Sequence, residues 1–157
     1  MNDLGKQFEK VFLKDWKRTF PGSFILRLPD QISGYKTTSK NICDYIGFNK
    51  GTLYLLECKS HKGNTLPFQN ISQYDKLVEN VGIEGVRVGV IIWFYEHDKV
   101  WYVPISTISK MKEDGKKSVN VRTDMDLGYN IIEIPSIKKR TFLESDYSIL
   151  TGLKENE

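Results

Sequence analysis

The sequence is poor in several features that mark common classes of protein. It has two cysteines, Cys43 and Cys58, which are too few for a disulfide scaffold and whose spacing matches no zinc-binding pattern. We expect both thiols to be reduced and buried. No apolar run approaches the roughly eighteen residues that cross a membrane, and the charged N-terminus lacks the apolar stretch of a signal peptide. We therefore expect a cytoplasmic protein with no membrane partner.

Other absences narrow the function further. The sequence shows no internal repeat, no low-complexity segment and no glycine-rich loop of the kind that cradles phosphates, so we expect no nucleotide cofactor. The net charge of +3 is too small to establish nucleic-acid binding by itself. The content of 39% hydrophobic and 12% aromatic residues suits a folded chain. A chain of 157 residues predicts a single domain over 1–157.

Residues 41–60 organise the rest of the chain. Two apolar segments, 43–48 and 53–58, flank Asn49-Lys50-Gly51, which supplies the residue types that a hairpin turn requires. Side chains alternate between the two faces of a strand. The predicted faces of the second strand are Leu53, Leu55, Glu57 and Lys59 on one side and Tyr54, Leu56 and Cys58 on the other. The hairpin therefore brings Asp44 close to Glu57 and Lys59.

Two carboxylates and an ammonium at one end of a hairpin suit divalent-metal chemistry. Mg²⁺ is held by one or two carboxylates, with water and substrate phosphate in the rest of its shell. A lysine beside it can orient water and offset charge on a phosphate. Glu57 and Lys59 would otherwise be ordinary solvent-facing strand residues, but they follow Leu53 and Leu55 on the same face. The pattern favours a metal-dependent hydrolase of phosphodiesters.

These residues resemble the signature of the PD-(D/E)xK nucleases. Asp44, twelve further residues and then Glu57-Cys58-Lys59 fit that signature, and the surrounding segments are similar to those of RecU-type and archaeal Holliday-junction resolvases. The segments that carry the resemblance are Gly5-Lys6-x-Phe8-Glu9, Asp44-Tyr45-x-Gly47, Glu57-x-Lys59 and Leu66-Pro67-Phe68-Gln69-Asn70. They occur in the family's order and cover about residues 4–105, which leaves 106–157 as a C-terminal extension.

The resemblance implies a fold and a set of roles. It implies a restriction-endonuclease-like α/β sandwich with a mixed central sheet flanked by helices. Asp44, Glu57 and a glutamine on the following helix would bind Mg²⁺, or Mn²⁺, and Gln73 matches best, with Gln69 and Asp75 as alternatives. Lys59 would be catalytic, and Glu9 would support the site. The resemblance further implies a homodimer that cuts paired strands of a four-way DNA junction, in recombination, repair or phage DNA processing.

Basic residues surround the candidate site. Five lysines and His61 lie between Lys36 and Lys62, and the only two acids in that interval are the candidate metal ligands. Such a basic environment attracts phosphate and predicts salt-dependent binding of nucleic acid. The alternative is an ordinary lysine-rich face that contacts only solvent. The candidate DNA-binding residues are Arg27, Lys36, Lys40 and Lys62. The cluster at 138–140, Lys-Lys-Arg, could hold a DNA arm or form a solvated turn.

Periodicity and turn signals predict the order of the elements. Pro29-Asp30 matches letters of the superfamily name, but we interpret it as a turn and assign the metal to Asp44. The predicted elements are a helix at 3–18, strands at 23–28, 86–94, 100–105 and 128–134 besides the hairpin, helices at about 71–81 and 105–111, polar loops at 31–40, 60–66 and 112–117, and a helix or extended tail at 141–153.

Two alternatives to a junction resolvase remain. The 31–40 connection is shorter than the stalk that enters the junction centre in RecU-like enzymes, which favours a nuclease of the same fold that cuts duplex, flap or nicked DNA. The other alternative is a DNA-junction-binding protein without catalysis. Intact Asp44, Glu57 and Lys59 count against it, because a binding protein gains nothing from carboxylates in a cleft that accepts phosphate.

Overall fold

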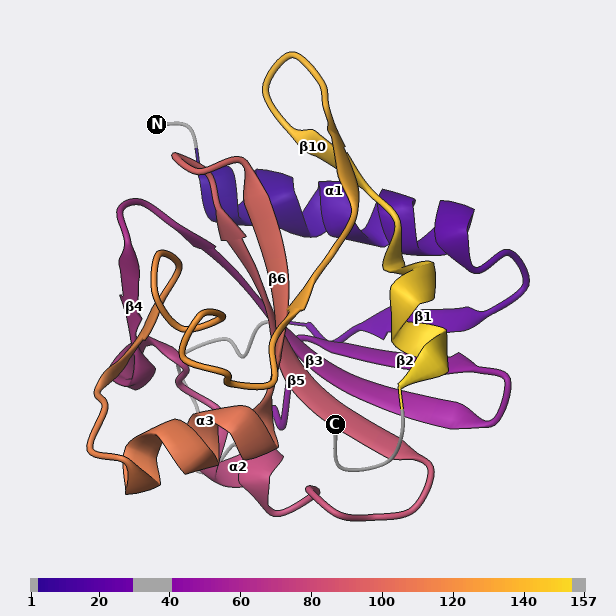
Figure 1. Ribbon diagram of the computed structural model, residues 1–157. Helices are drawn as coiled ribbons and strands as arrows, with labels where there is room; N and C mark the ends of the chain where they lie inside the picture. Colours follow the sequence, from indigo (N-terminus) through magenta and orange to yellow (C-terminus); the bar gives the residue numbers. More distant parts are fainter. Residues whose placement is uncertain (1–2, 30–40, 154–157) are drawn as a thin grey trace, which may run out of the picture.

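The computed structural model describes residues 3–29 and 41–153, which form a mixed β-sheet with helices on both faces (Figure 1). In spatial order the main sheet contains β1 (Phe24–Arg27), β2 (Tyr45–Asn49), β3 (Thr52–His61), β5 (Val86–Phe94), β6 (Lys99–Pro104) and β8 (Ile132–Glu133). Neighbouring strands of this sheet are antiparallel except β3 and β5, which are parallel. The predicted α/β sandwich with a mixed central sheet is confirmed.

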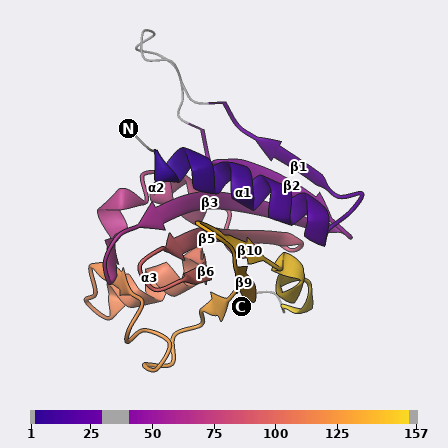
Figure 2. The ribbon, with the colours of Figure 1, turned by 90° about the horizontal axis from the view of Figure 1, so that it is seen from above.

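Three α-helices cover the sheet in the described part of the chain: α1 (Leu4–Thr19), α2 (Tyr74–Val78) and α3 (Ile105–Glu113). Seen from above, α1 lies along the sheet away from α3 (Figure 2). The remaining elements are the short strands β4 (Thr65–Pro67), β7 (Ser118–Asn120), β9 (Ser136–Lys138) and β10 (Leu143–Ser145) and the 3-10 helices η1 (Phe68–Asn70) and η2 (Tyr147–Gly152). β4 pairs with β7, and β9 pairs with β10. None of the described helices is both long and apolar enough to cross a membrane.

The hairpin of β2 and β3 forms as predicted. Asn49 pairs with Thr52, so the turn between the strands has two residues, Lys50 and Gly51. Both have positive φ, at 48° and 82°, which is the backbone conformation that joins antiparallel strands with their natural twist. A side chain at Gly51 would be strained in this conformation. The tight turn fixes the register of the two strands down to the far end, where Asp44 and Glu57 lie.

Each face of the sheet has its own apolar core. Side chains at alternate positions of β3 enter opposite cores, as predicted: Leu55 packs with α2 and α3, whereas Tyr54, Leu56 and Cys58 pack with α1. The α1 core is rich in aromatic residues, and Trp16 forms near-perpendicular ring contacts with Phe20 and Tyr54. Both cysteines are free and buried, as predicted.

Helix α1 is held at both ends by polar contacts. The Asp3 side chain accepts a hydrogen bond from the Lys6 backbone N–H and caps the first turn. In the second half of the helix, Asp15 is buried and accepts hydrogen bonds from Arg18 (2.8 Å) and from the backbone N–H of Ser145 (3.0 Å) in β10. Asp15 therefore ties α1 to the β9–β10 hairpin near the C-terminus.

Strand β5 matches the predicted bounds of the central buried strand, but other elements differ from expectation. The predicted helix at 71–81 is only the five residues of α2, because Asn80 donates its side-chain amide to the Lys76 carbonyl and Gly82 (φ 88°) turns the chain away. The predicted loop at 60–66 is partly strand, since β3 continues to His61 and β4 follows. The predicted tail at 141–153 contains β10 and η2, and β7 lies just after the predicted loop at 112–117.

Gly89 in β5 has no room for a side chain. A Cβ atom there would lie 2.3 Å from Cε2 of the buried Tyr102 ring on β6. We predict that Gly89→Ala lowers the free energy of unfolding by about 2–3 kcal/mol, the usual cost of overpacking a rigid core. Urea denaturation measures this. Gly152→Ala, where no atom lies within 4 Å, serves as the matched control and should change stability by less than about 0.5 kcal/mol. Equal stability of the two variants would contradict the prediction.

Candidate active site

Asp44 lies one residue before β2 and is held by backbone contacts on both sides. Its N–H donates to the Leu56 carbonyl (3.0 Å), and its carbonyl accepts from the Leu28 N–H (2.8 Å). Its side-chain Oδ2 accepts from the Cys58 N–H at 2.9 Å. Because Tyr45 pairs with Leu56, the same register places Asp44 beside Glu57. The hairpin therefore brings the two predicted carboxylates together.

Glu57 is the buried carboxylate of the pair, with a relative exposure of 1%. Burial raises its pKa to about 7, the Lys59 ammonium opposes the shift, and the nearby Asp44 charge adds to it. Within the described chain, Glu57 Oε2 is buried without a hydrogen-bond partner. A charged oxygen left in this state costs free energy, so it marks a place where a cation or proton is favoured.

Lys59 lies two residues further along the same face of β3. Its Nζ is 3.3 Å from Glu57 Oε1, and its side chain is 30% exposed. One end of the ion pair is therefore buried and the other reaches the surface. An ammonium in that position can contact a phosphate that approaches from solvent while it keeps its contact with the buried carboxylate.

The segment just before α2, which contains Ser72 and Gln73, also lies at the Glu57 carboxylate. The backbone N–H of Ser72 acts on the Glu57 carboxylate and lowers its pKa. Gln73 follows directly, and its Oε1 is buried with no hydrogen-bond partner in the described chain. The two alternatives for a helix-borne ligand, Gln69 and Asp75, are both exposed. The buried Oε1 thus distinguishes Gln73 from Gln69 and Asp75.

Glu9 belongs to α1 and is engaged by Arg27 of β1. Arg27 Nε and Nη2 both lie 2.9 Å from Glu9 Oε2. The pKa of the buried Cys58 thiol is raised first by burial and then by the charges of Asp44, Glu9 and Glu57, so all three carboxylates surround this residue of β3. The sequence did not indicate the contact of Glu9 with Arg27, because it joins a helix to a strand 18 residues away.

The oxygen donors at the site meet the requirements of a hard cation. Glu57 Oε2 and Gln73 Oε1 are two buried acceptor oxygens that have no donor among the residues the structure describes, and the Asp44 carboxylate lies next to Glu57. Oxygen donors of this kind fit Mg²⁺ or Mn²⁺. Among residues 3–29 and 41–153, no group of three His, Cys, Asp or Glu side chains could hold a metal ion, so Glu9 does not complete a three-carboxylate cage. The set fits a cation that keeps several waters.

The predicted DNA-binding residues are distributed unevenly. Lys36 and Lys40 lie outside the described residues, as do Asp30 and the 31–40 connection. Arg27 is at the site but already binds Glu9, and Lys62 is exposed just after β3. His97 is partly buried, and its Nε2 lies 2.7 Å from Asn64 Oδ1. Its position in a polar turn agrees with a surface residue.

The sequence of this site matches a known family. The family model of RecU, described as Recombination protein U, matches residues 25–143. The chain belongs to the RecU family. The RecU match covers Asp44, Glu57, Lys59 and Gln73, whereas Glu9 precedes it. No curated protein matches the chain. Among solved structures, it is similar to Hjc from Archaeoglobus fulgidus, a Holliday junction resolvase, with 19% identity and a TM-score of 0.48 over 66% of this chain and 78% of that one.

Burial of Glu57 predicts a pH-dependent stability. Its pKa in the folded RecU-family chain, about 7, is above the unfolded value near 4.5, so the metal-free protein loses stability as pH rises from about 4.5 to 7. We predict that Glu57→Gln raises the free energy of unfolding at pH 8 by about 1–3 kcal/mol and that the gain disappears near pH 4. Urea denaturation in a chelator measures this. Glu84→Gln, at an exposed glutamate, is the control, and an equal effect of both variants contradicts the prediction.

Proposed function

We propose that the protein is a divalent-metal-dependent DNA endonuclease that resolves four-way junctions in the cytoplasm, during recombination, repair or phage DNA processing. Membership of the RecU family supports the class of protein. One observation carries the chemistry: Glu57, buried at the end of an apolar strand face, has an oxygen without a hydrogen-bond partner among residues 3–29 and 41–153, and Lys59 reaches from it to the surface. A chain selected only for folding would not retain that arrangement.

The residues have distinct roles in this proposal. Asp44, Glu57 and Gln73 would hold Mg²⁺, or Mn²⁺. When bound, the ion lowers the pKa of water and offsets charge on the scissile phosphate. The hydrogen bond from the Cys58 N–H to Asp44 and the register with β3 fix the Asp44 carboxylate. Ligands that are already fixed need little reorganisation during the reaction. Such preorganisation is the main source of electrostatic catalysis.

Lys59 acts on the reacting atoms. Its ammonium donates to a phosphate oxygen and holds the attacking water in line with the phosphorus. The new bond from the water oxygen to phosphorus forms as the bond to the leaving sugar oxygen breaks, while the water releases a proton to solvent and the leaving oxygen takes one up. Glu57 orients the ammonium through the 3.3 Å contact. Glu9 and Arg27 support the site from α1 and β1, and their ion pair holds the first strand against the hairpin.

The substrate is proposed to be a junction cut by a homodimer. One site cuts one strand, so two related strands require two sites. The alternative is a nuclease of the same fold that cuts duplex, flap or nicked DNA. It is favoured by the short connection at 31–40, which is too brief for a long stalk.

Cleavage of labelled DNA tests the proposal. A four-way junction is compared with matched duplex, flap and single strand, in Mg²⁺ or Mn²⁺, for the intact protein, Glu57→Ala and Lys59→Ala. We expect symmetric paired cuts in the junction, a loss of at least about 100-fold in both variants, and no cleavage in a chelator. Equal cutting of all substrates supports the alternative. No cutting by folded protein in either metal contradicts the nuclease function.

The glutamine ligand has its own test. We predict that Gln73→Ala raises the metal concentration needed for half-maximal cleavage by about 10-fold or more, because a buried ligand oxygen is lost. Gln69→Ala removes an exposed amide four residues earlier and is the matched control, expected to change that concentration by less than about twofold. Metal titrations of the cleavage rate measure both. The reverse order of effects would assign the ligand to Gln69.

A further inference from the structure

The solvent-facing side of α1 carries a row of lysines. Lys6, Lys10, Lys14 and Lys17 are all exposed and, at 100° per residue, fall within an arc of about 80°. The buried residues Phe8, Phe12 and Trp16 lie on the opposite side of the helix. We call these four lysines the lysine row. In the described part of the chain, none of them forms an ion pair, although the Lys14 charge helps to lower the pKa of Glu144 on the neighbouring hairpin. The lysine row is therefore open to an external anion.

The acids of α1 do not cancel this charge. Asp15 is buried and bound to Arg18 and Ser145, and Glu9 is bound to Arg27 on the flank that faces the active site. The lysine row therefore runs along the outer surface between the flank that carries Glu9 and the flank that packs on the β9–β10 hairpin.

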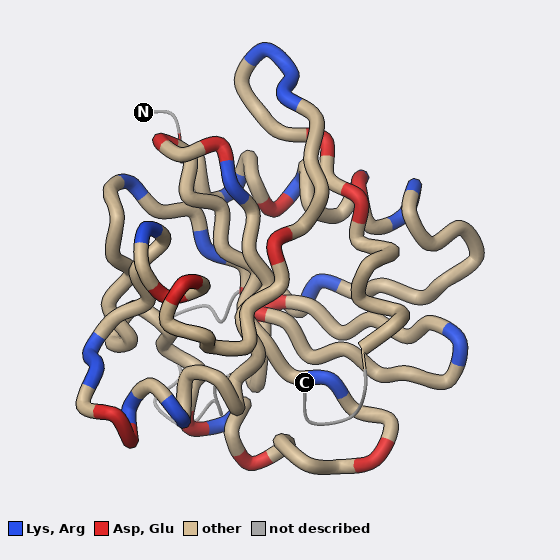
Figure 3. Tube along the Cα trace, in the orientation of Figure 1, with Lys and Arg blue, Asp and Glu red and all other residues tan. Residues whose placement is uncertain are grey.

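The hairpin continues the row. Its tip rises beyond α1 and carries Lys and Arg (Figure 3). Lys138 and Lys139 are paired with Asp98 and Glu144, but Arg140 is exposed, with no ion-pair partner among the described residues. Arg140 and Lys14 line the same hollow of about 460 Å³ between the helix and the hairpin. Two elements far apart in the sequence thus present positive charge to one surface.

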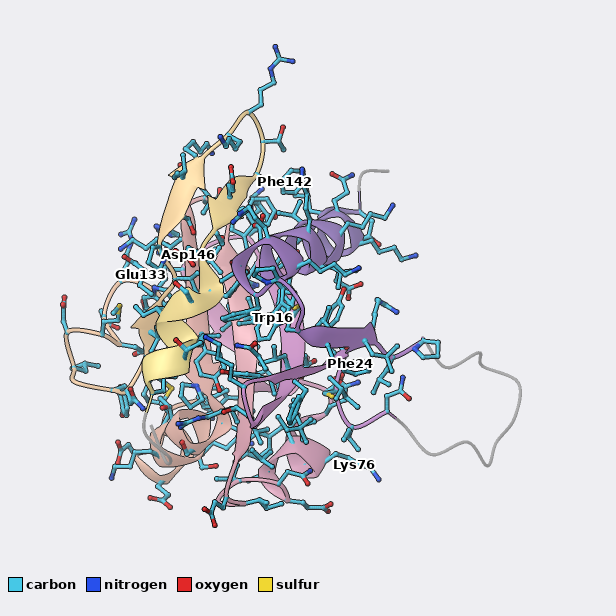
Figure 4. All side chains as sticks on the ribbon, turned by 90° about the vertical axis from the view of Figure 1, so that its right-hand side faces the viewer. Trp16, Phe24, Lys76, Glu133, Phe142 and Asp146 are labelled. Atoms are coloured by element: carbon cyan, nitrogen blue, oxygen red, sulfur yellow. The ribbon has the colours of Figure 1, made fainter. Side chains whose placement is uncertain are left out.

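The position of the hairpin is fixed. Phe142 packs its ring on Trp93, with centroids 5.1 Å apart, and lies beside α1 (Figure 4). Arg18 binds Glu144 and the Ser145 carbonyl, and Asp15 binds the Ser145 N–H. The cations therefore lie on a rigid support, which lowers the entropic cost of binding an extended anion.

We propose that the lysine row and Arg140 bind the phosphate backbone of a DNA arm outside the cleavage site. This inference rests on the proposed DNA substrate and adds a second surface to it. From Lys6 to Lys17 the row spans about 16 Å, and one DNA strand presents a phosphate about every 3.4 Å. The row thus faces about five phosphates of one strand.

The surface favours a duplex over a single strand. Proteins that hold single strands add aromatic platforms on which bases stack. The aromatic residues of α1, Phe8, Phe12 and Trp16, are all buried, so the helix offers cations without a stacking surface. Lysine contacts of this kind read charge and not sequence, and they position an arm without selecting its bases.

Salt-dependent binding tests the proposal. Binding of a labelled duplex and a four-way junction is measured without metal, between about 50 and 200 mM salt, for the intact protein, Lys10→Gln/Lys14→Gln/Arg140→Gln and a control, Lys50→Gln/Lys76→Gln. The control lysines are exposed and lie at the β2–β3 turn and on α2. Each lost phosphate contact reduces the slope of log K against log salt by about 0.9. We expect a slope smaller by about 2–3 in the triple variant and by less than about 1 in the control.

Cleavage separates this surface from the active site. With the triple variant in saturating excess over the junction, the single-turnover rate should stay within about twofold of the intact protein, because Asp44, Glu57 and Lys59 are untouched. If the salt slope of the triple variant equals that of the intact protein, the lysine row and Arg140 do not bind DNA, even if the variant cleaves the junction. A reduced slope in a protein that cuts nothing keeps the surface and rejects the nuclease function. Tighter binding of a single strand than of a duplex of the same length overturns the choice of duplex.

Discussion

The parallel pairing of β3 with β5 holds the rest of the structure in place. Nine residue pairs join the two strands, from Leu53 with Val86 to His61 with Phe94. Parallel neighbours require a crossover connection, and here the crossover runs through β4, η1 and α2. It brings Ser72 and Gln73 back to the face of β3 on which Glu57 lies. The topology of the sheet therefore adds Ser72 and Gln73 to the residues that the local β2–β3 hairpin already brings together.

The sequence contains strong information about the hairpin and the central strand. Alternation along β3 predicts which face Glu57 occupies, because strand geometry leaves only two choices, and a two-residue turn at Lys50 and Gly51 fixes the register with Asp44. Strand β5 follows from its continuous apolar run, which is typical of a strand buried on both faces. Its end at Phe94 was predicted because polar turn residues follow directly.

The parts that sequence reasoning missed depend on long-range contacts. Residues 71–81 have helical periodicity, yet Ser72 directs its N–H at Glu57 and Asn80 bonds the Lys76 carbonyl, so only a short helix forms. The strands β9 and β10 have three residues each, too few to be stable alone, and they depend on Asp15 of α1. The contact of Glu9 with Arg27 requires the docked helix. Apart from the local bond between Asn80 and Lys76, each of these contacts joins segments that are separate in the sequence.

The unpartnered oxygen of Glu57 has a consequence for how this chain can evolve. A buried carboxylate oxygen that has no donor among the described residues costs stability, so selection for heat resistance alone would favour replacement of Glu57. At position 57, therefore, substitutions that stabilise the fold would remove the site, and retention of the site keeps the fold less stable. Stabilising changes elsewhere, for example in the aromatic core under α1, would offset the cost of keeping Glu57.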